Sequence, residues 1–262
     1  MKEWDKKTQR RITRDIRLLL ACAILAAGIY IVGNIREDER TSSDSVQRTE
    51  EASGEKEVSQ DVSAGIAEDG DNSLEGLRDI LENLISRQSG EWSIYVKDLE
   101  EEVSLTVQNT SLYAASLIKL FVMEKTFLDF DQVAANVPEG DETGGEEHVL
   151  SLLANMIERS DNESFNELVR LQSEDLDFAE GCVLIDKYLG ENGYRDTAVY
   201  HSLSPSATGL VSIGDAENCT SVKDCGLLLE KIYQGTCVSQ EASERMLDML
   251  RKQETVNKIP EG

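Results

Sequence analysis

The sequence predicts an α+β domain behind an N-terminal transmembrane helix, because three kinds of pattern follow one another along the chain. An uncharged apolar run covers residues 18–35, alternating apolar residues occur near residues 92–107, and apolar residues keep helical spacing from Val149 onward. Alternation is typical of strands, whereas a spacing of three and four is typical of helices. We therefore expect an antiparallel sheet flanked by helices, followed by an all-α subdomain.

The first element is a membrane anchor. Residues 18–35 contain no charged residue and reach about 27 Å as a helix, enough to span the apolar part of a bilayer. Residues 1–17 hold seven Lys or Arg against three Asp or Glu. This positive excess favours the cytoplasm, so we expect a single-pass protein of the cell membrane with the rest of the chain outside. A cleaved signal peptide is the alternative, but no small-x-small cleavage site precedes a mature start.

The next segment is acidic and predicted to be disordered. Residues 36–72 hold twelve Asp or Glu against four Lys or Arg and no aromatic residue, so they cannot bury enough apolar surface to fold. We expect a stalk there and a folded domain over residues 73–262. The whole chain has a formal net charge of −25, which argues against nucleic acid as a partner because phosphates would repel it.

Cysteines and histidines give little indication of a metal or cofactor. Cys22 lies in the predicted anchor, and the other four cysteines lie in the outer domain, where disulfides are permitted. Three pairings are possible, and the sequence does not choose among them. His148 and His201 stand alone, so we predict no metal site and no cofactor.

The folded domain is expected to begin with a helix and a hairpin. Ser73 can cap a helix over residues 74–85, whose apolar residues keep the helical period and which should end near Gly90. Alternating residues over 92–96 and 103–107, joined through an acidic turn, predict a β-hairpin. With only these strands the sheet would be a two-stranded ribbon, which is marginal in water.

The later part of the chain is predicted to be mostly helical. We expect one helical stretch from Val149, a helix around residues 182–189, one that starts at Thr220 and one over residues 239–250. Residues 194–218 are rich in Ser and Gly and should be irregular.

Ser116 and Lys119 form a Ser-x-x-Lys pattern at the start of the apolar run 113–125. A helix brings such residues onto one face, about 5–6 Å apart, so the lysine amine can reach the serine hydroxyl. A neutral lysine, its pKa depressed by burial or a nearby cation, can then act as the base for a nucleophilic serine. The helix N-terminus also favours an oxyanion. The alternative is a capped core helix with a surface lysine.

A second polar pattern, Ser160-Asp161-Asn162, interrupts two helical segments 44 residues after Ser116. Short polar side chains at such a break commonly form caps and Asx turns. The position of this triplet, 44 residues after the Ser-x-x-Lys pattern, favours a functional role over a role in capping alone.

Together, these two patterns resemble the penicillin-recognising serine hydrolases, and most of all the class A β-lactamases, over the whole predicted folded domain. The resemblance implies a class A β-lactamase-like fold in which Ser116 attacks a β-lactam or a peptidoglycan peptide. It further implies that Lys119 helps to deprotonate the serine, that Ser160 relays a proton to the leaving nitrogen, and that Asn162 holds the substrate's amide. Asp161 should face inward and fix the turn.

The chain departs from this family in two respects. The family's β-lactamases use a loop glutamate to activate the water that clears the acyl-enzyme, and no glutamate occurs between Asp196 and Gly214. The family's Lys-Thr-Gly strand is also missing, and the chain stops at Gly262. We therefore expect a domain that is C-terminally incomplete, without the last strands and the closing helix.

The predicted function is a membrane-anchored, extracytoplasmic serine hydrolase of the β-lactamase type, with an acyl-enzyme at Ser116. A penicillin-binding protein resembling D,D-carboxypeptidases is one alternative, which the missing glutamate favours. A non-catalytic surface protein is another, which the missing Lys-Thr-Gly favours.

Overall fold

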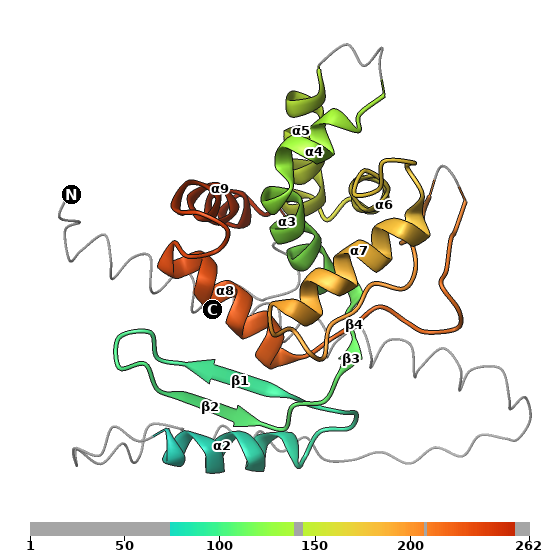
Figure 1. The fold of residues 1–262 in the computed structure, drawn as a ribbon. Coiled ribbons are helices and arrows are strands. Elements are labelled where there is room, and N and C mark those ends of the chain that lie inside the picture. Colours follow the sequence, from blue (N-terminus) through green and yellow to red (C-terminus); the bar gives the residue numbers. More distant parts are fainter. Residues whose placement is uncertain (1–73, 139–143, 207–208, 255–262) are drawn as a thin grey trace, which may run out of the picture.

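The computed structural model describes residues 74–138, 144–206 and 209–254 (Figure 1). The predicted cytoplasmic tail, anchor and stalk lie outside these residues. Within them, no helix combines the length and apolar character needed to cross a bilayer.

The domain begins with a helix and a hairpin, as predicted. Helix α2 (Glu75–Ile85) ends before the expected Gly90. Strand β1 (Ile94–Lys97) pairs antiparallel with β2 (Ser104–Val107), and Ile94 lies opposite Val107. In the part of the chain that the structure describes, this sheet is two strands wide.

Helices on either side hold the ribbon. Figure 1 shows α2 along β2 and α8 (Val222–Gln234) beyond β1. The α2 residue Arg78 donates from Nη1 to the Thr106 carbonyl at 3.0 Å. On the other side, a Cβ on Gly226 of α8 would lie 2.4 Å from the Tyr95 ring, so only glycine allows this approach. A ribbon that is marginal alone is therefore stabilised by packing.

A second ribbon was not predicted. Strand β3 (Leu112–Tyr113) pairs antiparallel with β4 (Cys219–Thr220), and the Ala114 amide donates to the Asn218 carbonyl at 2.8 Å. Two residues are too short to show an alternating pattern. This ribbon nevertheless ties the chain just before Ser116 to the segment that follows the irregular loop.

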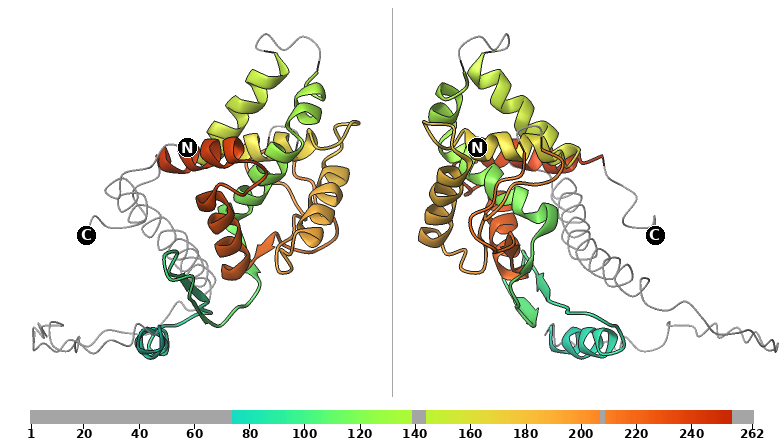
Figure 2. Two further views of the ribbon diagram at one scale, coloured as in Figure 1. Left: turned by 60° about the vertical axis from the view of Figure 1, so that its left-hand side comes forward. Right: turned by 90° about the vertical axis from the view of Figure 1, so that its right-hand side faces the viewer.

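The rest of the described chain is helical, and Figure 2 shows this half from two further sides. Helix α3 lies at its centre, and ten consecutive residues from Ile118 to Phe127 are buried. The helices are α3 (Ile118–Leu128), α4 (Phe130–Ala135), α5 (Gly145–Glu158), α6 (Asn162–Arg170), α7 (Phe178–Glu191), α8 and α9 (Gln240–Arg251). The predicted helices from Val149 onward are confirmed, whereas α4 is short and was missed.

The structure answers the question of disulfide pairing that the sequence left open. Cys182, Cys219, Cys225 and Cys237 are all free thiols, so the structure forms none of the three possible disulfide pairings. Burial raises the pKa of Cys182 and of Cys225 to about 12, so both thiols stay protonated at neutral pH. They act as small apolar core residues.

Candidate active site

The predicted nucleophile lies where a tight turn becomes a helix. Ser116 is the middle residue of a 3₁₀ turn, η2 (Ala115–Leu117), that leads directly into α3, and its side chain is exposed. Lys119 lies in the first turn of α3 and is only 2% exposed. Ala115 has φ +46°, a left-handed conformation that is unfavourable for a residue with a Cβ. Strained backbone of this kind is common at functional sites.

The second predicted pattern joins two helices. Ser160-Asp161-Asn162 connects α5 to α6, and the Asp161 carboxylate caps α6 by accepting from the Ser164 amide at 2.6 Å. Hydrogen bonding from Ser164 lowers the pKa of Asp161 below its usual value. Asp161 therefore fixes the turn, as predicted. Ser160 has φ +57°, a second left-handed residue in the site.

The two patterns meet through hydrogen bonds. Lys119 Nζ donates to the Ser160 carbonyl at 2.6 Å, to Ser160 Oγ at 3.1 Å and to Asn162 Oδ1 at 2.6 Å. Ser160 Oγ in turn donates to Ser116 Oγ at 2.9 Å. All four predicted site residues thus lie in one hydrogen-bonded group, although 44 residues separate Ser116 from Ser160. A proton can pass along such a group between the Ser116 hydroxyl and the lysine amine.

The irregular loop is held against this group by Asn166, which the sequence analysis missed as a site residue. Asn166 is 2% exposed, accepts from the Leu203 amide at 2.7 Å and donates to the Leu203 carbonyl at 2.8 Å. The next loop residue contacts the site itself, because Asn162 Nδ2 donates to the Ser204 carbonyl. Asn162 and Asn166 are four residues apart on one helix face, a spacing visible in the sequence.

A second buried asparagine fixes the other end of the loop. Asn218 is fully buried; its Oδ1 accepts from the Tyr200 and His201 amides at 2.7 and 3.0 Å, and its Nδ2 donates to the His201 carbonyl at 2.9 Å. No sequence motif marks this residue. His201 also bonds through Nε2 to Glu217, at 2.8 Å, so this glutamate pairs on the surface.

The loop supplies no glutamate to the site. None occurs between Asp196 and Gly214, and the loop residue against the hydrogen-bonded group is Ser204. This contact is made by the Ser204 backbone carbonyl, and the side chain that Ser204 offers is a hydroxyl, which is a poor base for activating water.

A serine at a helix start, joined through a second serine to a buried lysine, defines a serine hydrolase of the Ser-x-x-Lys class. Comparison with known proteins agrees. The Beta-lactamase enzyme family matches residues 76–262, and the chain belongs to this family. No curated protein matches the chain. The protein is therefore a serine hydrolase of the β-lactamase type, with the mixed helix and sheet architecture described above.

Proposed function

We propose that the protein forms an acyl-enzyme at Ser116 with a β-lactam or a cell-wall peptide. The observation that carries this proposal is the hydrogen-bonded group of Lys119, Ser160 and Ser116, in which the last hydroxyl is exposed to an incoming substrate. Serine is a weak nucleophile unless a base removes its proton, and this group provides the route.

The acylation step uses Ser116, Ser160 and Lys119. The Ser116 Oγ attacks the carbonyl carbon and forms a C–O bond, while its proton passes through Ser160 Oγ to the Lys119 amine. For this transfer the amine is neutral: it keeps its donations to the Ser160 carbonyl and Asn162 Oδ1, and its lone pair accepts from Ser160 Oγ. Serine hydroxyls rotate, so the hydrogen bond between the two serines can run in either direction. When the C–N bond of the substrate breaks, Ser160 delivers a proton to the leaving nitrogen and is reprotonated by Lys119.

Asn162 has two roles in this proposal. Its Oδ1 accepts from Lys119 Nζ at 2.6 Å and so positions the amine. Its Nδ2 carries two hydrogens, of which one is donated to the Ser204 carbonyl. The other hydrogen is the donor that we assign to the substrate's amide oxygen.

The proposed location is the outer face of the cell membrane. The uncharged residues 18–35 follow a basic segment, which supports a single-pass anchor with the catalytic domain outside. Cell-wall peptides and β-lactams are both encountered there.

The fate of the acyl-enzyme separates a β-lactamase from a penicillin-binding protein. Water must be activated to hydrolyse the ester, and a positioned base contributes roughly 10²–10⁴ to such a step. Because Ser204 occupies the loop position against the site, we infer slow hydrolysis, which favours the alternative of a carboxypeptidase-like penicillin-binding protein.

A non-catalytic surface protein is the third possibility. The chain contains no Lys-Thr-Gly, the triplet that supplies a cation for the substrate carboxylate in this family. Such a protein would keep the fold without acylation.

The test is covalent labelling of the full-length protein with a fluorescent penicillin. We expect stoichiometric labelling that Ser116→Ala abolishes, because Ser116 carries the exposed hydroxyl of the group, whereas Ser160 is partly buried behind it. Ser111→Ala is a suitable control, since Ser111 lies five residues before Ser116 and its hydroxyl donates to the Asp196 carbonyl at 2.8 Å, away from the Lys119 group.

Two outcomes discriminate among the alternatives. Hydrolysis of a chromogenic cephalosporin that outpaces accumulation of the label would identify a β-lactamase. A folded protein that neither takes the label nor turns over substrate would refute acyl transfer and leave the non-catalytic alternative.

A further inference from the structure

Asn218, the last residue of the irregular loop, connects two segments that border the Ser116 site. It is fully buried, and its main chain and side chain have different partners. Its backbone carbonyl accepts from the Ala114 amide at 2.8 Å. Its side chain forms three hydrogen bonds, all to the backbone of Tyr200 and His201. One residue therefore joins the turn that carries the nucleophile to the first limb of the loop.

On the nucleophile side, both peptide groups of Ala114 are held. Its amide donates to Asn218, and its carbonyl accepts from the Leu117 amide at 3.0 Å, which closes the turn around Ser116. The bond to Asn218 extends the pairing of β3 and β4 by one residue, up to this turn. The next residue, Ala115, is in the left-handed conformation, which persists only where the surroundings hold it.

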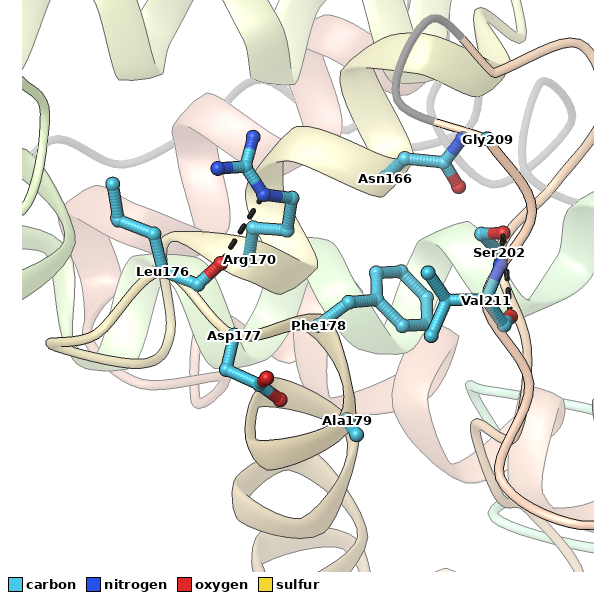
Figure 3. A pocket seen from close by; sticks show the side chains of 9 residues that line it. All are labelled: Asn166, Arg170, Leu176, Asp177, Phe178, Ala179, Ser202, Gly209 and Val211. Atoms are coloured by element: carbon cyan, nitrogen blue, oxygen red, sulfur yellow. Dashed lines mark hydrogen bonds between the residues drawn. The ribbon is translucent and has the colours of Figure 1, made fainter.

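On the loop side, the Asn218 side chain takes the place of a pairing strand. The backbone of Ala198 still pairs with β4, whereas the amides of Tyr200 and His201 bond to the Asn218 side chain. A primary amide can do this because it carries an acceptor and two donor hydrogens. The two limbs of the loop then pair with each other, and Figure 3 shows the bonds between Ser202 and Val211 as dashed lines.

These links complete a hydrogen-bond network around the site. Three residues after His201, the Ser204 carbonyl accepts from Asn162. From there the network continues through the hydrogen-bonded group of Asn162, Lys119, Ser160 and Ser116. It returns from the turn of Ser116 to the loop through Asn218. Loss of the Asn218 side chain would therefore separate the loop from the nucleophile turn.

We propose that Asn218 is a positioning residue for acylation, which holds the turn of Ser116 in register with the loop. This inference rests on the proposed acyl transfer. The proton route needs Ser116 Oγ within hydrogen-bond distance of Ser160 Oγ, and the two atoms are 2.9 Å apart. Without the Asn218 side chain, two amides and one carbonyl lose their buried partner, so the segments shift to satisfy them. A displacement of about 1 Å can lower a rate about 100-fold.

Two substitutions test this inference through the kinetics of labelling by a fluorescent penicillin. Asn218→Ser removes the three side-chain bonds and leaves room for water. Asn218→Asp keeps an acceptor for the two amides but places a second oxygen against the His201 carbonyl, to which Asn218 donates at 2.9 Å. At about pH 8, each variant should lower the acylation rate constant at least about tenfold. The dissociation constant of the penicillin before acylation should change less than about threefold, because buried Asn218 does not contact it.

The pH profile shows whether these hydrogen bonds set the rate. Near pH 5 the buried new carboxyl of Asn218→Asp takes up a proton and donates to the His201 carbonyl, as the amide does. Its rate relative to the parent should therefore rise at least about threefold from the value at about pH 8, whereas Asn218→Ser should stay low. Dividing by the parent's rate at each pH removes the effects on Lys119 and on the His201–Glu217 pair, which all three proteins share.

Asn136→Asp is the matched control. This partly buried asparagine donates to the Leu171 carbonyl at 3.0 Å, at the end of α4 and outside the network. The control should label at the parent rate. The proposal is overturned if a folded Asn218 variant labels like the parent, if the loss lies only in the dissociation constant, or if both variants keep the same relative rate at both pH values.

Hydrogen exchange separates this proposal from acyl transfer itself. A parent protein that takes no label refutes acyl transfer, but the Ala114 amide still reports on the link to Asn218. This amide should exchange at least about tenfold faster in Asn218→Ser than in the parent, and unchanged exchange would overturn the role of Asn218. Far-UV circular dichroism checks that each variant is folded, and either folded variant is sufficient for the comparison with the parent.

Discussion

Helix α3 and the loop of residues 194–218 both border the candidate site, yet they are stabilised in different ways. Residues Ile118 to Phe127 of α3 are buried in succession, so the helix that carries Lys119 is held by close packing on every side. The loop exposes Leu210 at 67% and Val211 at 37%, and buried Asn166 and Asn218 hold it through hydrogen bonds. Lys119 thus lies on a rigid element, whereas the side chains of the neighbouring loop can be exchanged without disturbing the packed core.

The largest expected effect is the loss of a core side chain of α3, the helix that follows the nucleophile. Phe121 is fully buried on α3 and packs edge to face against Tyr194, with ring centroids 5.1 Å apart. Phe121→Ala should lower the free energy of unfolding by about 3–5 kcal/mol, because it leaves a cavity in a close-packed region. Guanidinium unfolding followed by circular dichroism measures this change.

The matched loop variant is Leu210→Ser, which removes an aliphatic side chain of similar hydrophobicity from the exposed loop. We expect a change within about 0.5 kcal/mol. Equal losses in the two variants would contradict the contrast between core and loop.

The next effect concerns turnover and leaves stability unchanged. Ser204→Glu places a carboxylate at the loop position whose carbonyl accepts from Asn162. A base here should speed hydrolysis of the Ser116 ester by at least about tenfold, and release of a fluorescent penicillin from the labelled protein measures the rate. Ser204→Gln has nearly the same shape without a basic group, so it should leave the rate unchanged. Equal acceleration by both variants would show that loop shape, and not base catalysis, limits hydrolysis.

The smallest effect is a pH dependence at the start of the loop. Asp186 of α7 accepts from the Val199 amide at 2.8 Å, and burial raises the pKa of this carboxyl to about 6. Between about pH 4 and 6 the folded protein therefore binds more protons than the unfolded chain, so this group's contribution to stability falls as pH rises through that window. Above pH 6 the cost of the buried charge is constant.

Asp186→Asn removes this cost and keeps an oxygen for the Val199 amide. We expect the variant to be more stable than the parent above pH 6, by about 1 kcal/mol because Asp186 is only half-buried and solvent screens its charge. The difference should shrink toward pH 4 and vanish below about pH 3, where the aspartate is protonated in both states. Thermal unfolding from about pH 3 to 8 measures it, and a difference that grows toward acid would have the wrong sign.

Much of the candidate site was predictable because its residues stand in short, regular patterns. Ser116 and Lys119 are three residues apart, on the turn η2 and the start of α3, and Ser160 and Asn162 flank the start of α6. Their spacing along the chain is therefore enough to predict which element carries each residue. Asn166 was missed although it lies four residues after Asn162, because a lone asparagine inside a helix has many structural explanations. Asn218 has no local signal at all.

The sequence by itself determined the helices other than α4, the hairpin and the choice of the four candidate site residues, because these follow from periodicity and from the spacing of short patterns. Only the tertiary structure decided that Lys119 and Ser116 meet through Ser160, that Ser204 lies against Asn162, and that the four cysteines stay apart as thiols. The first two features depend on segments 40 or more residues apart, and packing of α3 against α5 and α6 brings Lys119 and Ser160 together. Local patterns do not encode such distances.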